Sequence, residues 1–426
     1  MVKLLIISII VLGYFVLAVI FSFKYKFIQL KALGETRKIL VKEKNRSAYS
    51  AFMLSMASHI GTGNIVGIST AIIYGGPGSL FWMWVFTIFS SIFSLIENTL
   101  GQVYKEKIDG EFRGGACFYI RKGLNNKVLS IIFALFLVLT NTVFFQPLQV
   151  NTISETINIT FGIDKVLILV GFVIFTYIVI FNGTRRIVRF SEFIVPIMSI
   201  TYLAVTIFII SVNITSFGSM IKVIFQDAFN LNSILAGGCC SCLLIGFKRS
   251  LFSHEAGLGT MPSISAMADI KHPVQQGYVS TVGVYVDTLI MCTLTGFTIL
   301  IFNQDTSGFQ GVDLIIYIFE LMLGKLGFYL AGFFMFTFAL ATVVGEFYLG
   351  ESNLLYIIKE KKNKTWYNII YKGLFLFGIY IGVTNNTREI FSIVDMGMVF
   401  LGIANIYAII KLKHVFDSEL KMYNEL

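Results

Sequence analysis

The stretch "SHIGTGNIVGISTAIIYGGPG", residues 58–78, decides the fold of this chain. It lies in a long apolar segment, yet it carries Gly61, Gly63 and Gly67 around a Thr and an Asn. A glycine in a helix interior costs about 1 kcal/mol relative to alanine, so three close together predict an interruption of the helix. A second run of this kind, "SLFSHEAGLGTMP", follows at 250–262.

The composition is that of an integral membrane protein. Of the 426 residues, 56% are hydrophobic and 13% are charged, whereas roughly one quarter are charged in soluble domains. A transmembrane helix needs about 17–25 mainly apolar residues. Eleven segments qualify, at 4–22, 49–73, 79–103, 128–146, 166–183, 188–212, 234–250, 278–302, 328–350, 368–384 and 392–411. We therefore predict an all-α membrane protein with eleven transmembrane helices. The first segment is longer than a typical signal-peptide core, which favours a retained helix.

Lysines and arginines predict the orientation, because basic loops stay on the cytoplasmic side. If alternate loops are placed inside, starting with 23–46, most of the 33 Lys and Arg residues fall on that side. This predicts a multi-pass plasma-membrane protein with its N-terminus outside and its C-terminus in the cytoplasm. The net charge of +9 then follows from topology, so membrane lipid is an expected partner and nucleic acid is not. The oligomeric state stays open.

The segments also repeat. Without the first, ten remain, and they divide into two groups of five that each begin with a glycine-interrupted segment. The second group begins with "LAGGCCSC" at 235–242 and continues into "KRSLFSHEAGLG" at 248–259. Because five is odd, the second group must run inverted relative to the first. Broken helices at matching positions of inverted repeats are typical of secondary transporters and mark their binding sites.

This pattern divides the chain into four parts. Residues 1–46 form a peripheral helix and a basic cytoplasmic loop, and 47–213 form the first five-helix repeat. Residues 234–412 form the inverted second repeat, and 413–426 form a cytoplasmic tail. A binding site gives a physical reason for the glycines. Backbone N–H and C=O groups released from a helix are costly in hydrocarbon unless a ligand or another group forms hydrogen bonds with them. Amide groups at the beginning of a half-helix suit a carboxylate, and carbonyl groups at the end of the other half suit a cation.

Several longer motifs carry a family resemblance. They are "IGTGNIVGISTAIIYGGPGSLFWMWV" (60–85), "GGACFYIRKGL" (114–124), "FSHEAGLG" (252–259), "ADIKHPVQQG" (268–277) and "VDTLIMCTLT" (286–295). In this order they resemble the alanine or glycine:cation symporter family, also called the sodium:alanine symporter family. The resemblance implies a five-plus-five inverted-repeat core like that of the sodium-coupled neurotransmitter transporters. It also implies symport of a small neutral amino acid, alanine or glycine, with Na⁺ and less often H⁺, by alternating access.

The resemblance implies site residues as well. The substrate carboxylate would lie on the amides near Thr62 and Gly63, and Asn64 would help to hold the break. Na⁺ would be bound by the carbonyl groups of Ala57 and Ile60 and by the hydroxyl group of Thr342, since a hard cation takes oxygen ligands. No organic cofactor is implied.

The second broken segment adds three candidate substrate-binding residues. Cys239, Cys242 and Leu243 have the spacing of one helical face, one to two turns before Arg249. Their side chains would either widen the substrate cavity or pack against a neighbouring helix. The cluster "CCSC" lacks a fourth nearby ligand, so a metal site is not expected there.

Glu346 departs from the family, which usually has Trp at this position to line the substrate cavity. A carboxylate in a membrane helix is costly and normally paired or functional. Glu346 would therefore face the pathway, where it selects a cationic amino acid or couples transport to H⁺, or it would reach water or a nearby basic residue.

Other polar residues in or near the segments have two interpretations each. His59 would be a pH-sensitive part of the site or a neutral ring with a local hydrogen bond. His254 stands where the family usually has Asn. Glu97 and Glu192 are expected to pair with the cytoplasmic basic loops, whereas Asp287 lies nearer mid-membrane and is not explained in that way.

Three other classes of function make different demands on the sequence. A channel would need a continuous polar lining, and a membrane enzyme would need a nucleophile with a base or a metal cluster. Polar residues here gather at two breaks, and the four histidines are scattered. A non-transporting amino-acid sensor on the same fold would keep the pocket and lose the coupling, so it stays open.

Overall fold

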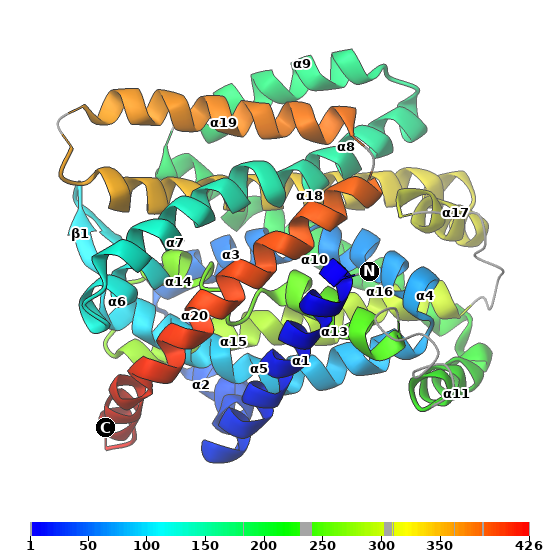
Figure 1. Cartoon of the computed structure of the whole chain (residues 1–426). Coiled ribbons are helices and arrows are strands. Elements are labelled where there is room, and N and C mark those ends of the chain that lie inside the picture. Colours follow the sequence, from blue (N-terminus) through cyan, green and yellow to red (C-terminus); the bar gives the residue numbers. More distant parts are fainter. Residues whose placement is uncertain are drawn as a thin grey trace.

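The computed structural model describes residues 2–181, 183–230, 241–301, 309, 311–361, 363–385 and 387–425 of the chain (Figure 1). The described residues are almost entirely helical. The elements of the first half are α1 (Val2–Lys24), η1 (Ile28–Lys31), α2 (Ala32–Arg37), η2 (Lys38–Lys42), α3 (Arg46–His59), η3 (Gly63–Gly67), α4 (Ile68–Gly75), α5 (Gly78–Val103), β1 (Glu106–Ile108), β2 (Glu111–Arg113), α6 (Ala116–Gly123), α7 (Lys127–Leu139), η4 (Thr140–Phe144), α8 (Gln146–Phe161), α9 (Lys165–Phe175), η5 (Thr176–Ile180), α10 (Thr184–Val212), η6 (Ile214–Ser216) and α11 (Phe217–Ala228).

The second half continues the helical pattern. Its elements are α13 (Cys242–His254), α14 (Pro262–Ser265), α15 (Pro273–Val284), η8 (Tyr285–Cys292), α16 (Thr293–Leu300), α17 (Val312–Leu323), α18 (Lys325–Ile358), α19 (Lys364–Thr384) and α20 (Thr387–Asn424). The elements η1 and η6 are 3₁₀ helices, and the other η elements are π-helical turns. Such turns are rare and often lie at functional sites.

Within the described residues, eight helices are long and apolar enough to cross a membrane. They are Ile6–Lys24, Gly78–Val103, Lys127–Phe161, Thr184–Val212, Pro273–Leu300, Lys325–Ile358, Lys364–Thr384 and Val394–Asn424. The chain is therefore a multi-pass membrane protein. The count differs from the predicted eleven for identifiable reasons. The segment at 49–73 is divided between α3 and α4, the one at 166–183 forms the shorter apolar helix Lys165–Ile180, and the one at 234–250 lies partly outside the described residues.

Helix α5 forms the centre of the packing. Most of its side chains are buried, and it has extensive contacts with α13 and α15. Its approach to α15 depends on Gly277, where an added Cβ would lie 2.6 Å from the Leu95 carbonyl oxygen and still closer to the Thr99 hydroxyl. Small residues at helix contacts let backbones approach in membrane bundles.

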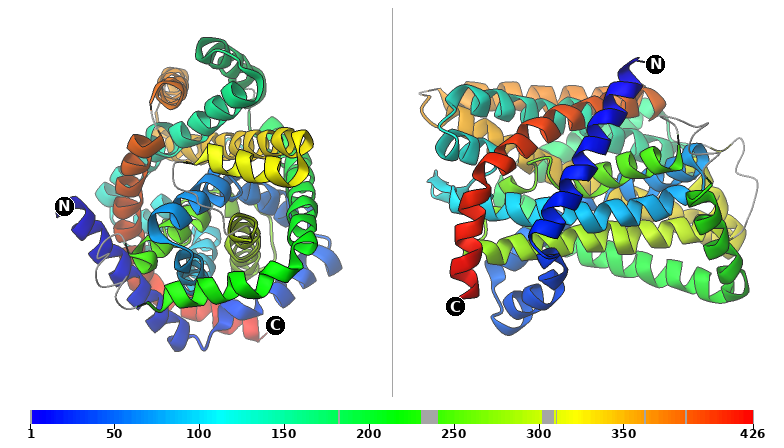
Figure 2. Two further views of the ribbon diagram at one scale, coloured as in Figure 1. Left: turned by 90° about the vertical axis from the view of Figure 1, so that its right-hand side faces the viewer. Right: turned by 60° about the horizontal axis from the view of Figure 1, so that its bottom comes forward.

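Two groups of helices lie at the periphery. Helices α9 and α19 contact each other and lie together at the upper edge of Figure 1. Helices α1 and α20 contact each other and α5, and both views in Figure 2 show them on the same side of the molecule. The segment that the sequence marks as peripheral thus packs directly on the central helix.

A short β-hairpin follows α5. Strands β1 and β2 are antiparallel with Ile108 paired to Glu111, so Asp109 and Gly110 form a two-residue turn. Both turn residues have positive φ, 52° and 84°, as an Asp-Gly hairpin turn requires. The Glu106 carboxylate lies 2.9 Å from the ammonium groups of both Lys122 and Lys359, which ties the hairpin to α6 and to the end of α18.

We expect Gly277→Ala to reduce the free energy of unfolding by about 1–3 kcal/mol, because the added methyl group overpacks the α5–α15 contact. The matched control is Gly171→Ala in α9, where an added Cβ meets nothing within 4 Å. That change should leave stability unchanged or raise it. The melting temperatures of the purified proteins in one detergent decide, and equal values for both variants would contradict the packing argument.

Candidate functional site

The first predicted break is present between α3 and η3. Helix α3 ends at His59, and Ile60 leaves the helical conformation with φ −75° and ψ 85°. The N–H of Gly61 is then hydrogen-bonded to Oδ1 of Asn64 at 3.0 Å. The Asn64 side chain thus accepts from one of the backbone N–H groups that the break releases.

The backbone around the break contacts two further helices. The N–H of Thr62 donates to Oε1 of Gln149 on α8 at 3.1 Å. The Thr342 hydroxyl of α18 lies 3.4 Å from the carbonyl oxygen of Ile60. Gly61 faces both side chains, and a Cβ there would collide with the Thr342 hydroxyl group. Glycine at this position is therefore required by the close approach of α18.

The second break follows α13. The helix ends at His254, and Glu255 adopts a left-handed conformation with φ 51°. The N–H groups of Gly257 and Gly259 then donate to the two carboxylate oxygens of Glu97 at 2.9 and 3.0 Å. Asn405 of α20 donates to the same carboxylate at 2.7 Å. The expectation that Glu97 pairs with cytoplasmic basic residues is wrong, because this carboxylate is buried and satisfied by three donors at the second break.

Asp287 connects the two breaks. It lies in the π-helical turn η8 and is fully buried. Asn64 donates to its Oδ1 at 2.6 Å, and Ser253 and Thr288 donate to its Oδ2 at 2.7 and 2.8 Å. One carboxylate therefore joins the first broken helix to the end of α13.

A small cavity lies between the breaks. Its wall is formed by Ser58, His59, Gly61, Gly63, Phe145, Gln149, Phe252, Ser253, Glu255, Thr342 and Glu346. The space open to the centre of a water-sized sphere is about 10 Å³, which is room for about one water molecule or small ion.

Several polar atoms in this wall lack a hydrogen-bond partner within the described part of the chain. They are Oγ of Ser58, both ring nitrogens of His59, and Oε2 of Glu255 and of Glu346. Buried polar groups are normally paired, so such a gathering at one cavity indicates a site for a polar ligand. The local hydrogen bond expected for His59 is not among the interactions of the described residues.

The structure brings part of the predicted site together. Gly63, Thr342 and Glu346 line the cavity, and Ile60 contacts Thr342. Ala57 is buried one turn before Ile60 in α3, and Thr62 is buried at the break itself.

Two of the three candidates from the second broken segment, Cys242 and Leu243, lie away from the cavity. Helix α13 begins at Cys242, and only its other end, at Phe252 and Ser253, reaches the cavity wall. Cys242 is directed to the carbonyl oxygen of Asp227 instead, with Sγ 3.8 Å away, and Leu243 packs with the apolar core. Cys239 lies outside the described residues.

Sequence reasoning missed several residues of the wall. Gln149, Ser58, Phe252, Ser253 and Glu255 belong to it. Gln149 gave no distinct signal, because its helix α8 carries many other polar side chains. Glu192 behaves as expected, since its carboxylate lies 2.6 Å from the Arg46 guanidinium. His254 is satisfied through Nδ1, which accepts from the N–H of Ala256 at 3.0 Å.

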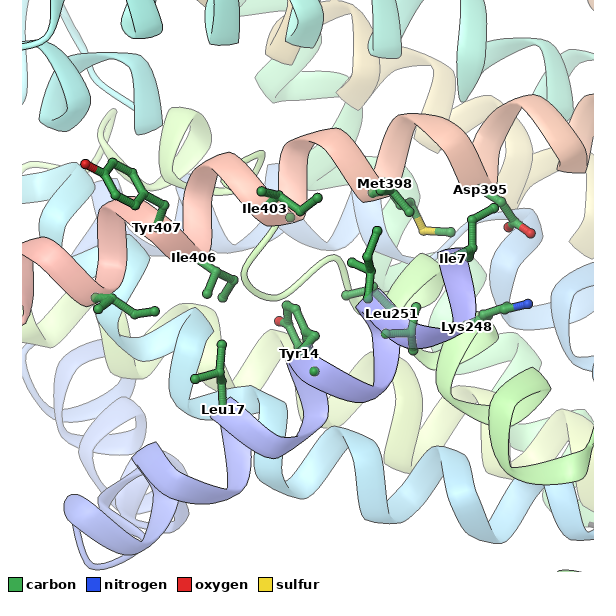
Figure 3. A pocket seen from close by; sticks show the side chains of 16 residues that line it. Ile7, Tyr14, Leu17, Lys248, Leu251, Asp395, Met398, Ile403, Ile406 and Tyr407 are labelled. Carbon is green, nitrogen blue, oxygen red and sulfur yellow. The ribbon is translucent and has the colours of Figure 1, made fainter. Parts of the chain in front are cut away.

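A larger groove between α1, α13 and α20 has a different character (Figure 3). On the same measure its volume is about 300 Å³, and apolar side chains such as Leu17, Leu251 and Ile406 line it. Lys248 and Asp395 lie at one end. Burying a zwitterion among apolar groups is costly, so the small polar cavity and not this groove is the candidate site.

Comparison with known proteins matches the whole chain, residues 1–426, to the sodium:alanine symporter family. The chain is 34% identical to the amino-acid carrier protein AlsT of Bacillus subtilis, over 96% of this chain and 87% of that protein. It is 34% identical to the probable sodium/glutamine symporter GlnT of the same organism, over 95% and 85% of the two chains. It is 32% identical to the sodium/alanine symporter AgcS of Methanococcus maripaludis, over 89% and 84%. These matches confirm the resemblance that the motifs indicate.

We expect Glu97→Gln to lower the free energy of unfolding by about 1.5–3 kcal/mol, because the neutral amide loses a charge-assisted hydrogen bond to the second break. Glu360→Gln is the control, since its side chain is 69% exposed and contacts Arg121 at only 3.4 Å. Exposed pairs contribute about 0–1 kcal/mol. Thermal unfolding of both variants measures the difference, and a control that loses as much as Glu97→Gln would refute this role.

Proposed function

Because the chain belongs to the sodium:alanine symporter family, a family of transporters and not of enzymes, we propose that it imports a small neutral amino acid of the alanine or glycine class together with Na⁺. Membership itself implies an amino-acid:cation symporter that is coupled to sodium. The observation that carries the finer proposal is the polar cavity between the two interrupted helices, with its unpartnered side-chain atoms.

The amino acid would bind at the first break. Oε1 of Gln149 accepts a hydrogen bond from the N–H of Thr62. In the proposed complex, a carboxylate oxygen of the substrate takes this position. A bound carboxylate would displace this oxygen, accept from Thr62 and Gly63, and receive the Gln149 amide donor. Phe145 and Phe252 in the wall limit the space for a substrate side chain, which supports a substrate the size of alanine or glycine.

The coupling Na⁺ would bind beside Thr342. The contact between its hydroxyl group and the carbonyl group of Ile60 supports this position, and the Ala57 carbonyl group would add a ligand from the preceding turn. Na⁺ is a hard cation that takes oxygen ligands. Carbonyl groups at the end of α3 also carry the partial negative charge of a helix C-terminus.

The transport cycle would follow from a five-plus-five inverted repeat that alternates between outward and inward access. In this arrangement the chain has eleven spans in the plasma membrane, with its N-terminus outside and its C-terminus in the cytoplasm. Two breaks joined through Asp287 support it, because movement of one broken helix is transmitted to the other.

The function is tested with purified protein in liposomes. Uptake of radiolabelled alanine, glycine and lysine is measured under an inward Na⁺ gradient and then under a proton gradient. We expect alanine or glycine to accumulate with the Na⁺ gradient and lysine to be excluded. Specific alanine binding without accumulation under either gradient would identify a sensor, and accumulation of lysine would overturn the neutral substrate class.

Thr342→Ala should raise the Na⁺ concentration for half-maximal uptake about tenfold to a hundredfold, because one oxygen ligand worth about 1.5–3 kcal/mol is lost. The control is Thr337→Ala in the same helix, whose hydroxyl group donates to the carbonyl oxygens of Phe333 and Phe334, at 2.8 and 3.2 Å. Na⁺ titrations of alanine uptake decide. Equal Na⁺ dependence in both variants would exclude Thr342 as a ligand.

A further inference from the structure

We propose that Glu255 and Glu346 together hold a second cation, so that each cycle carries two positive charges with one neutral amino acid. This inference rests on the proposed function and adds the charge stoichiometry of the same site. It begins with two carboxylates that reach one cavity from different elements. Glu346 lies on α18 one turn beyond Thr342, and Glu255 directly follows α13 at the second break.

Both carboxylates are buried and incompletely satisfied. Their residues are 2% and 5% exposed, and Oε2 of each lacks a hydrogen-bond partner in the described ranges. The other two buried carboxylates at the breaks differ, because Glu97 and Asp287 each accept three hydrogen bonds from protein groups. Protein donors thus stabilise one pair of carboxylates, whereas the cavity pair needs a partner from outside the protein.

The charges around the cavity do not balance. Among the described residues that form its wall, the titratable groups are His59 on α3, Glu255 after α13 and Glu346 on α18, and none is Lys or Arg. Asp287 lies behind Ser253 and is saturated by its donors. A zwitterionic amino acid and a single Na⁺ would leave one negative charge uncompensated, and an unpaired buried charge costs several kcal/mol.

The atoms available in the cavity wall indicate what kind of ion supplies the missing positive charge. Oxygen atoms of Glu255, Glu346 and Ser58 are free to act as ligands, and oxygen ligands suit a small hard cation. The rise of about 1.5 Å per residue in a helix separates Glu346 from Thr342 by about 6 Å along α18, so the pair lies one turn beyond the first Na⁺ position. The space open to the centre of a water-sized sphere is about 10 Å³, which favours Na⁺ or H⁺ over an organic cation.

The test measures charge stoichiometry in proteoliposomes at a constant Na⁺ gradient and several alanine gradients. The membrane voltage at which net alanine flux is zero changes with the alanine gradient at a slope of RT/zF, so this slope gives z, the number of charges that move with each alanine. We expect two for the natural protein and one for Glu346→Gln and for Glu255→Gln, which keep side-chain size and remove one charge. Glu360→Gln, on an exposed surface, should retain two. One charge per alanine in the natural protein would overturn the inference.

The same measurement identifies the cation. If the second cation is Na⁺, the zero-flux voltage changes with the Na⁺ gradient at the same slope as in Glu346→Gln and does not respond to pH, because the number of Na⁺ ions and the number of charges double together. If it is H⁺, the slope against the Na⁺ gradient is half that of the variant, and a pH gradient shifts the voltage in the natural protein and not in the variant. Either result supports the pair, whereas an identical response to the alanine, Na⁺ and pH gradients in the natural protein and the variant contradicts it.

Failure of the proposed function is recognised separately, as absence of alanine uptake under any gradient. Binding of ²²Na⁺ to the purified protein at several pH values then tests the cation site at Glu255 and Glu346 without requiring transport. A second bound Na⁺, or Na⁺ binding whose pH dependence disappears in Glu346→Gln, supports the cation site. The same Na⁺ binding at every pH in the natural protein and in Glu346→Gln refutes it.

Discussion

The structure depends on one constraint, that backbone groups released by a broken helix must find partners where the surroundings are apolar. The two breaks meet it in different ways. At the first, the side-chain oxygens of Asn64 and Gln149 accept hydrogen bonds from the N–H groups of Gly61 and Thr62. At the second, the single carboxylate of Glu97 takes two glycine N–H groups. At each break, buried polar side chains accept hydrogen bonds from backbone N–H groups that the interrupted helix leaves unpaired.

The polar residues in the interior therefore fall into two sets. Asn64, Glu97 and Asp287 are saturated by protein donors and acceptors, and they hold the interrupted segments in place. His59, Glu255 and Glu346 carry atoms with no partner in the described part of the chain, and all three line one cavity. The first set is a scaffold, and the second set belongs to the candidate site. All six side chains are buried, so burial alone does not separate the two sets. The number of hydrogen-bond partners does.

Helices α1 and α20 also support the second break. The Tyr14 hydroxyl of α1 donates to the carbonyl oxygen of Ala256, and Asn405 of α20 donates to the carbonyl oxygen of Gly257 at 2.9 Å. Helix α1 is thus hydrogen-bonded directly to the unwound segment, although 242 positions separate Tyr14 from Ala256 in the chain.

The sequence by itself determined the class of protein, its apolar segments, the place of the first break and the family. Composition, glycine spacing and long motifs report on local backbone preference and on burial, and these properties do not depend on distant contacts. Only the tertiary structure decided which polar groups meet. It joined Glu97 to Gly257, turned Cys242 away from the cavity, and added Gln149 and Glu255 to the wall. These outcomes depend on how helices far apart in the chain approach each other, because a hydrogen bond needs two groups within about 3 Å, and no local pattern encodes that distance.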